Sequence, residues 1–140
     1  MATLFTKIIA GELPGRFVWK DDLCVAFLTI NPLNPGHALV VPREEVDHWL
    51  DLSPELAAHL NEVARLVGTA IQAAFSPTKV GLIIAGLEVN HVHLHVVPIN
   101  SLGDLNFANA DTAPEPADMD QAAQSLRSAL RDLGRSEVCD

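Results

Sequence analysis

Three histidines that alternate with aliphatic residues are the feature of this chain that most strongly suggests chemistry. His91, His93 and His95 lie within the segment Asn90–Val97 and make up half of the six histidines in the sequence. Alternation with a period of two is typical of a β-strand, in which successive side chains point to opposite faces. The segment therefore predicts a strand with three imidazoles on one face and an aliphatic core face on the other.

Such a row of imidazoles is suited either to metal binding or to nucleophilic catalysis. Histidine is a common metal ligand, but His91 and His95 would lie about 13 Å apart along a strand, which is too far for one ion to bind all three. A metal site would therefore use His91 and His93 with ligands from elsewhere. A neutral imidazole is also a good nucleophile near pH 7. In that chemistry the flanking imidazoles would hold a phosphate and transfer protons, so all three histidines have a use.

The rest of the pattern predicts the elements that position these residues. Short apolar runs at residues 16–20, 23–28, 38–41 and 79–85 predict further strands. Ser53 and Pro54 open a long amphipathic pattern that predicts a helix ending near Ser76. Together these elements predict an α+β fold with an antiparallel sheet of about five strands and one long helix. The loop before the strand at 38–41, rich in Asn, Pro and Gly, delivers His37 to the head of that strand.

The chain is predicted to divide into three parts. Residues 4–99 form the main domain, and residues 100–117, which are small and polar, form a loop over the site. Residues 118–134 carry apolar side chains at helical spacing and predict a C-terminal helix, with Gly134 at its end. His48 and His59 lie outside the alternating segment and are predicted to be surface residues.

Composition narrows the classes of partner. The chain has 140 residues and a formal net charge of −9, which argues against a nucleic-acid polymer as partner, because such partners favour a basic face. It has two cysteines, Cys24 and Cys139, and no Cys-x-x-Cys pair, which disfavours a thiolate zinc site. Neither a signal peptide nor a membrane span is predicted, so a cytoplasmic protein is the simplest expectation.

Three motifs carry a resemblance to a known family. The segment His91–Val97 reads His-Val-His-Leu-His-Val-Val, and it is similar to the signature of the histidine triad (HIT) family. Upstream, Asn31–Pro42 resembles that family's Pro-Gly-His segment, and Leu4–Pro14 resembles its N-terminal motif. The motifs occur in the family's order and span residues 4–98. The resemblance implies a HIT-like fold, commonly a homodimer.

The resemblance also implies a reaction. In HIT proteins the middle histidine attacks the α-phosphate of a nucleotide derivative and forms a covalent nucleotidyl-histidine, which water or another acceptor then resolves. By position the nucleophile is His93, with His91, His95 and His37 as the other histidines of the site. No cofactor and no metal is implied. A purine nucleotide or its derivative is the implied ligand, and the nucleotide-binding positions are Phe5, Ile8, Phe27, Leu28, Thr29, Ile30, Glu88 and Val89.

Three positions depart from the family pattern. Many members carry an acidic residue at position 29, where a carboxylate takes both ribose hydroxyls, but Thr29 makes only weaker single contacts. Before the triad, Leu87 and Glu88 replace an amide and a hydroxyl. A protonated Glu88 would act as a general acid, an ionised Glu88 would repel phosphate, and a Glu88 turned to solvent would contribute only its backbone.

The leading hypothesis is a nucleotide hydrolase or nucleotidyl transferase that works through His93. Its expected substrates are phosphoramidates, dinucleoside polyphosphates or adenylylated amines. One alternative is a nucleotide-binding module with little catalysis, which the departures at Thr29, Leu87 and Glu88 motivate. A further alternative is a metal-dependent hydrolase that uses His91 and His93.

Overall fold

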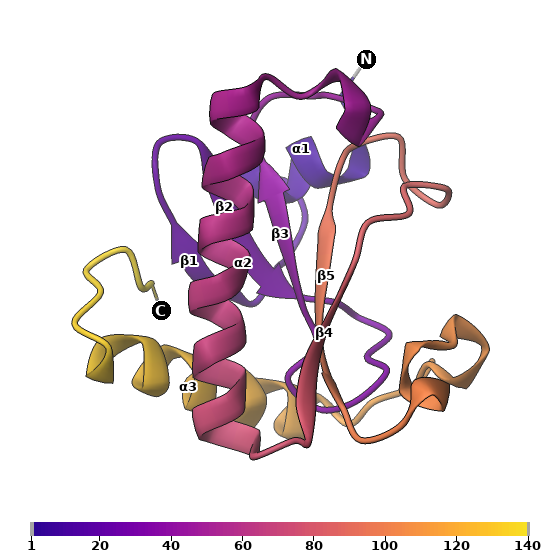
Figure 1. Cartoon of the computed structure of the whole chain (residues 1–140), viewed down its shortest axis with the longest axis vertical. Coiled ribbons are helices and arrows are strands. Elements are labelled where there is room, and N and C mark those ends of the chain that lie inside the picture. Colours follow the sequence, from indigo (N-terminus) through magenta and orange to yellow (C-terminus); the bar gives the residue numbers. More distant parts are fainter. Residues whose placement is uncertain (1, 140) are drawn as a thin grey trace.

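The structure is a computed structural model that describes residues 2–139. Figure 1 shows a sheet crossed on one face by a long helix, with a shorter helix below it. The elements, in chain order, are α1 (Leu4–Ile9), β1 (Phe17–Lys20), β2 (Cys24–Leu28), β3 (Ala38–Pro42), the 3₁₀ turn η1 (Trp49–Asp51), α2 (Pro54–Phe75), β4 (Lys79–Ile83), β5 (Leu94–Ile99), the 3₁₀ turns η2 (Leu102–Leu105) and η3 (Phe107–Asn109), and α3 (Pro116–Asp132).

The five strands form one antiparallel sheet in the order β1-β2-β3-β5-β4. This confirms the predicted α+β class with an antiparallel sheet. Strands β3 and β5 are neighbours although the long helix α2 and strand β4 separate them in sequence. The pairing matters for function because it brings the loop before β3 next to the histidine segment.

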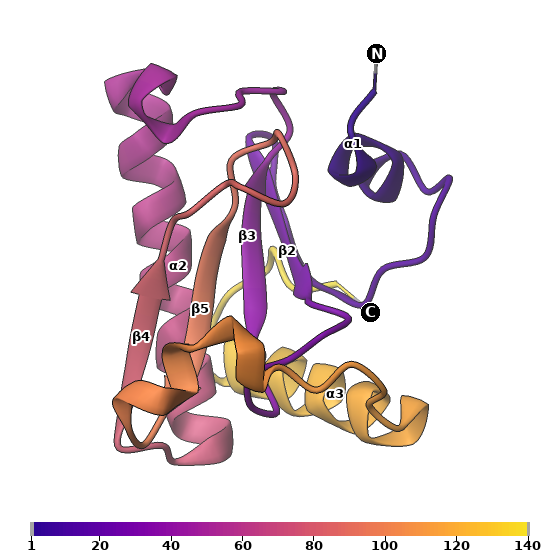
Figure 2. The ribbon, with the colours of Figure 1, turned by 90° about the vertical axis from the view of Figure 1, so that its right-hand side faces the viewer.

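The two faces of the sheet are covered by different helices, as Figure 2 shows. Alternate residues of β2 divide between them: Cys24, Ala26 and Leu28 join the core with α2 and α3, whereas Val25 and Phe27 join a smaller cluster with Phe5 of α1. This division follows from the two-residue period of a strand. Helix α1 therefore covers the face of the sheet opposite to α2.

Helix α2 follows its sequence signals closely. The Ser53 side chain accepts a hydrogen bond from the Leu56 amide at 3.2 Å, and Pro54 occupies the first turn. Leu60, Val67 and Ile71 are fully buried against the sheet. The helix ends at Ser76, which adopts a left-handed conformation with φ of 50°.

The histidine strand differs from its prediction. Strand β5 begins at Leu94 rather than at Asn90, so His91 and His93 precede it. Pairing with β3 reaches only from Ala38–Val96 to Val40–Leu94, because β3 ends at Pro42, which has no amide proton to continue the ladder. The alternation of faces nevertheless persists, since Val92 is buried in the same core as the side chains of Leu94 and Val96.

Helix α3 packs on the same face of the sheet as α2. Residues 100–115 contain two short 3₁₀ turns rather than an open loop, and α3 begins two residues before the predicted helix. The Arg127 side chain donates to the Phe17 carbonyl at 2.8 Å, which ties α3 to β1. None of the helices within residues 2–139 combines the length and the hydropathy that a membrane span needs.

Candidate active site

A glycine turn places His37 at the head of β3. Gly36 has a φ of +100°, and a Cβ atom on it would lie 2.6 Å from the Phe75 ring, so a side chain at this position would meet both strain and a clash. The His37 ring is buried. Its Nδ1 accepts a hydrogen bond from the Leu33 amide at 3.1 Å. Because an amide can only donate, the proton of the neutral His37 ring must sit on Nε2.

His37 in turn fixes the tautomer of His95. His37 Nε2 lies 3.0 Å from His95 Nδ1, across the paired strands β3 and β5. With the proton on His37 Nε2, His95 Nδ1 is the acceptor, and the proton of the neutral His95 ring is left on Nε2. The Leu33 amide therefore fixes the position of the proton on His37 and, through it, on His95. Within residues 2–139, no acceptor is seen for the resulting His95 Nε2–H.

The tautomer of His93 is set by a carbonyl. His93 Nδ1 lies 2.8 Å from the main-chain oxygen of His91, which only accepts, so the ring proton sits on Nδ1. The lone pair is then on Nε2. The His93 ring centroid is 4.9 Å from that of His95 and 4.9 Å from that of Phe5. This geometry leaves His93 Nε2 available as a nucleophile, with the His95 ring at its side.

Burial keeps these rings neutral. Burial, with a smaller effect of the neighbouring histidines, lowers the pKa of His37 to about 3 and that of His95 to about 4. Burial also lowers the pKa of His93, against the opposing effects of the hydrogen bond to the His91 carbonyl and of the Glu88 charge. All three rings are therefore uncharged at pH 7, each with a proton on one nitrogen only. Nucleophilic attack requires this state.

His91 has a different role in the site from the other histidines. Its ring is fully buried, with Nε2 2.7 Å from the Pro42 carbonyl oxygen and Nδ1 2.7 Å from the Thr3 hydroxyl. Both ring nitrogens are thus hydrogen-bonded inside the protein. His91 contacts His93 through its main-chain oxygen, whereas its ring anchors the segment.

Four of the eight predicted nucleotide-binding residues gather on the α1 face beside His93. Phe5 and Phe27 pack edge to face, with ring centroids 5.7 Å apart. Ile8 and Val89 are half-buried against the same cluster. Phe5 also contacts the His93 ring directly. These side chains form an apolar wall on the side of His93 that Phe5 contacts.

The other four predicted nucleotide-binding residues do not join this cluster. The Leu28 side chain faces the core under α2, on the opposite side of the sheet from Phe27. The Thr29 hydroxyl accepts weakly from the Asn31 amide at 3.3 Å, and Ile30 is 72% exposed. Glu88 is exposed but close enough for its charge to act on His93.

One aromatic contact was missed from the sequence. The Phe107 ring, in η3, packs edge to face on His95 with centroids 4.9 Å apart. The segment at 100–117 was predicted to lie over the site, but no residue in it was singled out. The available signal was that Phe107 is the one aromatic residue between positions 100 and 117.

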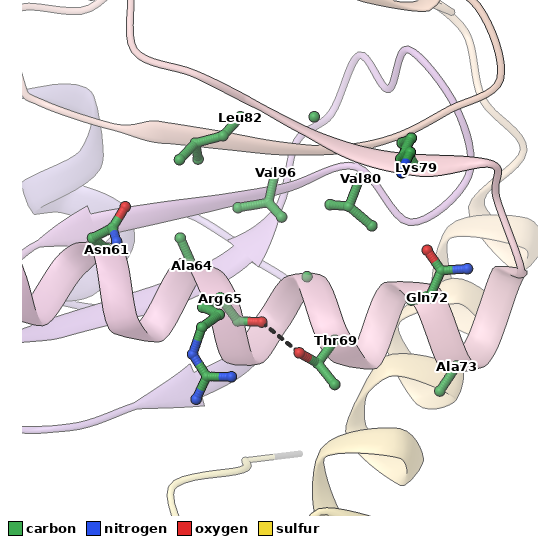
Figure 3. Close-up of a pocket in the computed structure, with 12 residues that line it drawn as sticks. Asn61, Ala64, Arg65, Thr69, Gln72, Ala73, Lys79, Val80, Leu82 and Val96 are labelled. Carbon is green, nitrogen blue, oxygen red and sulfur yellow. Dashed lines mark hydrogen bonds between the residues drawn. The ribbon is translucent and has the colours of Figure 1, made fainter.

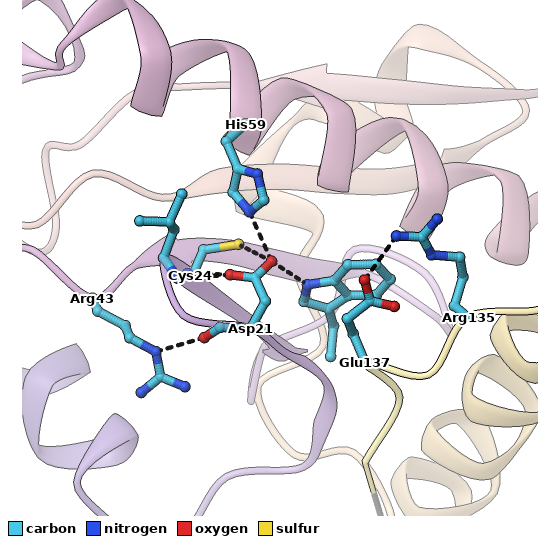
Figure 4. Close-up of polar contacts among 8 residues, drawn as sticks. Asp21, Cys24, Arg43, His59, Arg135 and Glu137 are labelled. Atoms are coloured by element: carbon cyan, nitrogen blue, oxygen red, sulfur yellow. Dashed lines mark hydrogen bonds and ion pairs between the residues drawn. The ribbon is translucent and has the colours of Figure 1, made fainter.

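A metal site made by His91 and His93 does not fit these contacts, because both His91 ring nitrogens are already hydrogen-bonded. Within residues 2–139, the one group of three potential metal ligands is Asp21, Cys24 and His59, away from the triad. Figure 4 shows the hydrogen bonds of this group. Burial and the neighbouring Asp21 raise the pKa of the Cys24 thiol, which keeps it protonated, whereas a metal ligand would be a thiolate.

His59 was predicted as a plain surface residue, but its Nε2 lies 2.7 Å from Asp21 Oδ2.

Comparison with known proteins agrees with this geometry. The model of the HIT domain matches residues 10–102. An uncharacterized HIT-like protein of Borreliella burgdorferi is 38% identical over 102 residues, which cover 68% of this chain and 73% of that protein. An adenylylsulfatase of Arabidopsis thaliana is 29% identical over 133 residues, covering 91% of this chain and 67% of that protein.

A solved structure shares the whole fold. The zinc-bound histidine triad family protein of Mycobacterium smegmatis superposes with a TM-score of 0.83 at 26% identity, covering 96% of each chain. The domain match spans both the loop that carries His37 and the segment that carries the three alternating histidines. The chain therefore belongs to the HIT domain family.

Proposed function

We propose that this protein is a nucleotide hydrolase or nucleotidyl transferase that works through a covalent intermediate on His93. HIT proteins include nucleotide-binding proteins and hydrolases, which gives the coarse class. One observation carries the finer proposal: the hydrogen bond from His93 Nδ1 to the His91 carbonyl leaves an unprotonated Nε2 in a neutral, buried ring. A module that only binds nucleotides would not need such a nucleophile.

The proposed reaction has two steps. His93 Nε2 forms a bond to the α-phosphorus while the bond from phosphorus to the amine or polyphosphate leaving group breaks. An amine leaving group takes its proton from solvent water, and His95 Nε2–H donates a hydrogen bond to a phosphoryl oxygen. The His93 Nδ1–H bond to the His91 carbonyl supports the positive charge on the ring. Water then attacks phosphorus and releases a proton to solvent, and the nitrogen–phosphorus bond breaks to release the nucleoside monophosphate and neutral His93. Two easier displacements replace one difficult displacement.

Capture of the intermediate tests this proposal. We expect rapid quenching of the protein with adenosine phosphoramidate to show a population whose intact mass has increased by one adenylyl group. Peptide mapping should place the group on His93. Binding of AMP without any adduct or turnover would favour the binding module, for which the weak contacts of Thr29 and the exposed Glu88 are the supporting observations. Dialysis against a chelator should leave turnover unchanged.

The substrate class is also part of the proposal. Phosphoramidates, dinucleoside polyphosphates and adenylylated amines all place a leaving group on the α-phosphorus of a nucleotide. The apolar wall of Phe5, Ile8, Phe27 and Val89 suits a purine base. The transfer partner is water in the hydrolase form and a second acceptor in the transferase form.

We further propose that the protein is a homodimer that pairs through β4. This strand lies at one end of the sheet order, so only β5 pairs with it. A groove of about 700 Å³ runs between α2 and β4, as Figure 3 shows. Small and apolar side chains meet in it, including Ala64, Val80 and Leu82. An edge strand beside an apolar groove suits a second copy of the same surface.

We expect Leu82→Glu to convert the dimer to a monomer. Leu82 is 49% exposed, so a charge there would be tolerated in the monomer but would be buried in the pair. Sedimentation at several protein concentrations measures the effect. The matched control is Leu50→Glu, an exposed leucine in η1 outside the groove. A wild-type protein that sediments as a monomer at all concentrations would contradict the proposal.

A further inference from the structure

The His91 ring connects three parts of the chain that are distant in sequence. Its Nε2 lies 2.7 Å from the Pro42 carbonyl oxygen, so Nε2 carries the ring proton. Its Nδ1 is then an acceptor in the neutral ring, and the Thr3 hydroxyl donates to it at 2.7 Å. Both edges of a fully buried ring are thereby held, one by the end of β3 and one by the residue that precedes α1.

The contacts continue from Thr3 to a carboxylate. The Thr6 amide donates to Thr3 Oγ1 at 3.1 Å, and the Thr6 hydroxyl donates to Glu45 Oε1 at 2.5 Å. The Thr3 amide donates to the same carboxylate oxygen at 2.9 Å. These hydrogen bonds lower the pKa of the Glu45 carboxyl, so it is an ionised acceptor at neutral pH. Thr3, Thr6 and Glu45 thus form a continuous row that ends on the His91 ring.

The row is placed to control the nucleophile from two sides. The main-chain oxygen of His91 accepts from His93 Nδ1 at 2.8 Å, and this bond selects the tautomer that frees Nε2. On the other side the Phe5 ring contacts His93, and Phe5 is the one buried residue of the six-residue helix α1. A helix this short has little stability of its own, so its place on the sheet depends on such contacts.

We propose that Thr3, Thr6 and Glu45 are positioning residues that hold the His91 ring and the start of α1, and thereby orient His93. The inference rests on the proposed function, because it concerns the orientation of the nucleophile. None of the three contacts the His93 ring or its Nε2, so they act through His91 and Phe5. Loss of the row should therefore lower the rate of the chemical step more than it lowers substrate affinity.

Variants at Thr3 separate the hydroxyl from the shape of the side chain. We expect Thr3→Val to lower kcat by about 10- to 100-fold, with KM changed by no more than about twofold. Thr3→Ser restores the hydroxyl and should restore kcat. Glu45→Gln keeps an acceptor for Thr6 and should have a smaller effect than Glu45→Ala. Thr78→Val is the matched control, because the exposed Thr78 hydroxyl donates to Asn100 Oδ1 at 3.0 Å and lies outside both the row and the α2–β4 groove.

Nitrogen NMR of the histidine rings provides a second readout that does not depend on turnover. We expect His93 to hold its proton on Nδ1 in wild type and in Thr3→Ser, and to show a mixture of tautomers in Thr3→Val. An unchanged His93 tautomer together with an unchanged kcat in Thr3→Val would overturn the inference. If even the wild type lacks turnover, the proposed function fails, whereas the tautomer measurement still decides whether the row positions His93.

Discussion

Replacement of His93 by alanine is expected to lower kcat for adenosine phosphoramidate by about 10³-fold or more. Removal of a nucleophile from a site whose residues act as a unit has effects of this size or larger. The structure supplies the reason, because His93 Nε2 is the nitrogen left without a proton by the bond from Nδ1 to the His91 carbonyl. Steady-state kinetics of the purified variant measure the effect. The covalent adduct should disappear together with turnover.

The control for this prediction is His48→Ala. His48 is exposed, and its Nδ1 accepts from the Leu50 amide at the start of η1, away from the triad. Its loss should leave kcat within about twofold of wild type. Thermal unfolding of both variants checks that each is folded. Turnover by folded His93→Ala at the wild-type rate would rule out covalent catalysis at this residue.

The second large effect is expected on stability, from Asp21→Ala. The Asp21 carboxylate accepts from the Trp19 indole at 2.8 Å, from His59 at 2.7 Å, and from the amides of Leu23 and Cys24 at 2.8 Å each (Figure 4). Trp19 is 1% exposed, so its N–H cannot turn to water when the carboxylate is removed. A loss of about 3 kcal/mol in the free energy of unfolding is expected from stranding these donors.

The same carboxylate predicts a pH dependence. Burial alone would raise the pKa of Asp21, but the hydrogen bonds from Trp19, from the Cys24 and Leu23 amides and from His59 lower it to about 2. The folded state therefore stays ionised where the unfolded chain, with a pKa near 3.8, takes up a proton. The stabilisation is present above pH 3.8 and is lost as the pH falls towards 2, at about 1.4 kcal/mol per pKa unit.

Urea unfolding at pH 7 and at pH 3 tests both statements. Asp21→Ala should unfold at a clearly lower urea concentration at pH 7, and the difference from wild type should shrink at pH 3. Asp22→Ala is the matched control, since Asp22 is the exposed neighbour in the same turn, and its effect should stay within about 0.5 kcal/mol. Equal unfolding midpoints for Asp21→Ala and wild type at pH 7 would contradict the argument.

Local sequence signals were sufficient for most of the fold. The alternating strands, the Ser53 cap and the apolar face of α2 are decided by neighbours within a few residues, so the pattern alone predicts them. The predicted start of β5 was wrong because the true start depends on pairing with β3. Pairing with β3 stops at Val40–Leu94, two residues before Pro42, and nothing within the histidine segment itself records that limit.

The chemistry of the site depended on contacts that no local pattern contains. The motif resemblance predicted that His37 and His95 share the site, but their direct bond joins residues 58 positions apart, and the Thr3 bond to His91 joins residues 88 positions apart. The tautomer of each ring follows from a single backbone donor or acceptor. Residue types could therefore identify the histidines, whereas the structure was needed to show which nitrogen of each ring carries the proton.

The two edge strands of the sheet, β1 and β4, differ in what covers their outer side. Beyond β1, the C-terminal segment lies alongside the strand, where the Lys20 amide donates to the Glu137 carbonyl at 2.9 Å and Trp19 forms a bridge with Val138. The edge at β4 has no such cover among residues 2–139. A sheet with one blocked edge can add strands in a single direction. In the proposed dimer, two copies that meet at β4 would leave a covered β1 edge at each end, and such a sheet would not grow into a fibre.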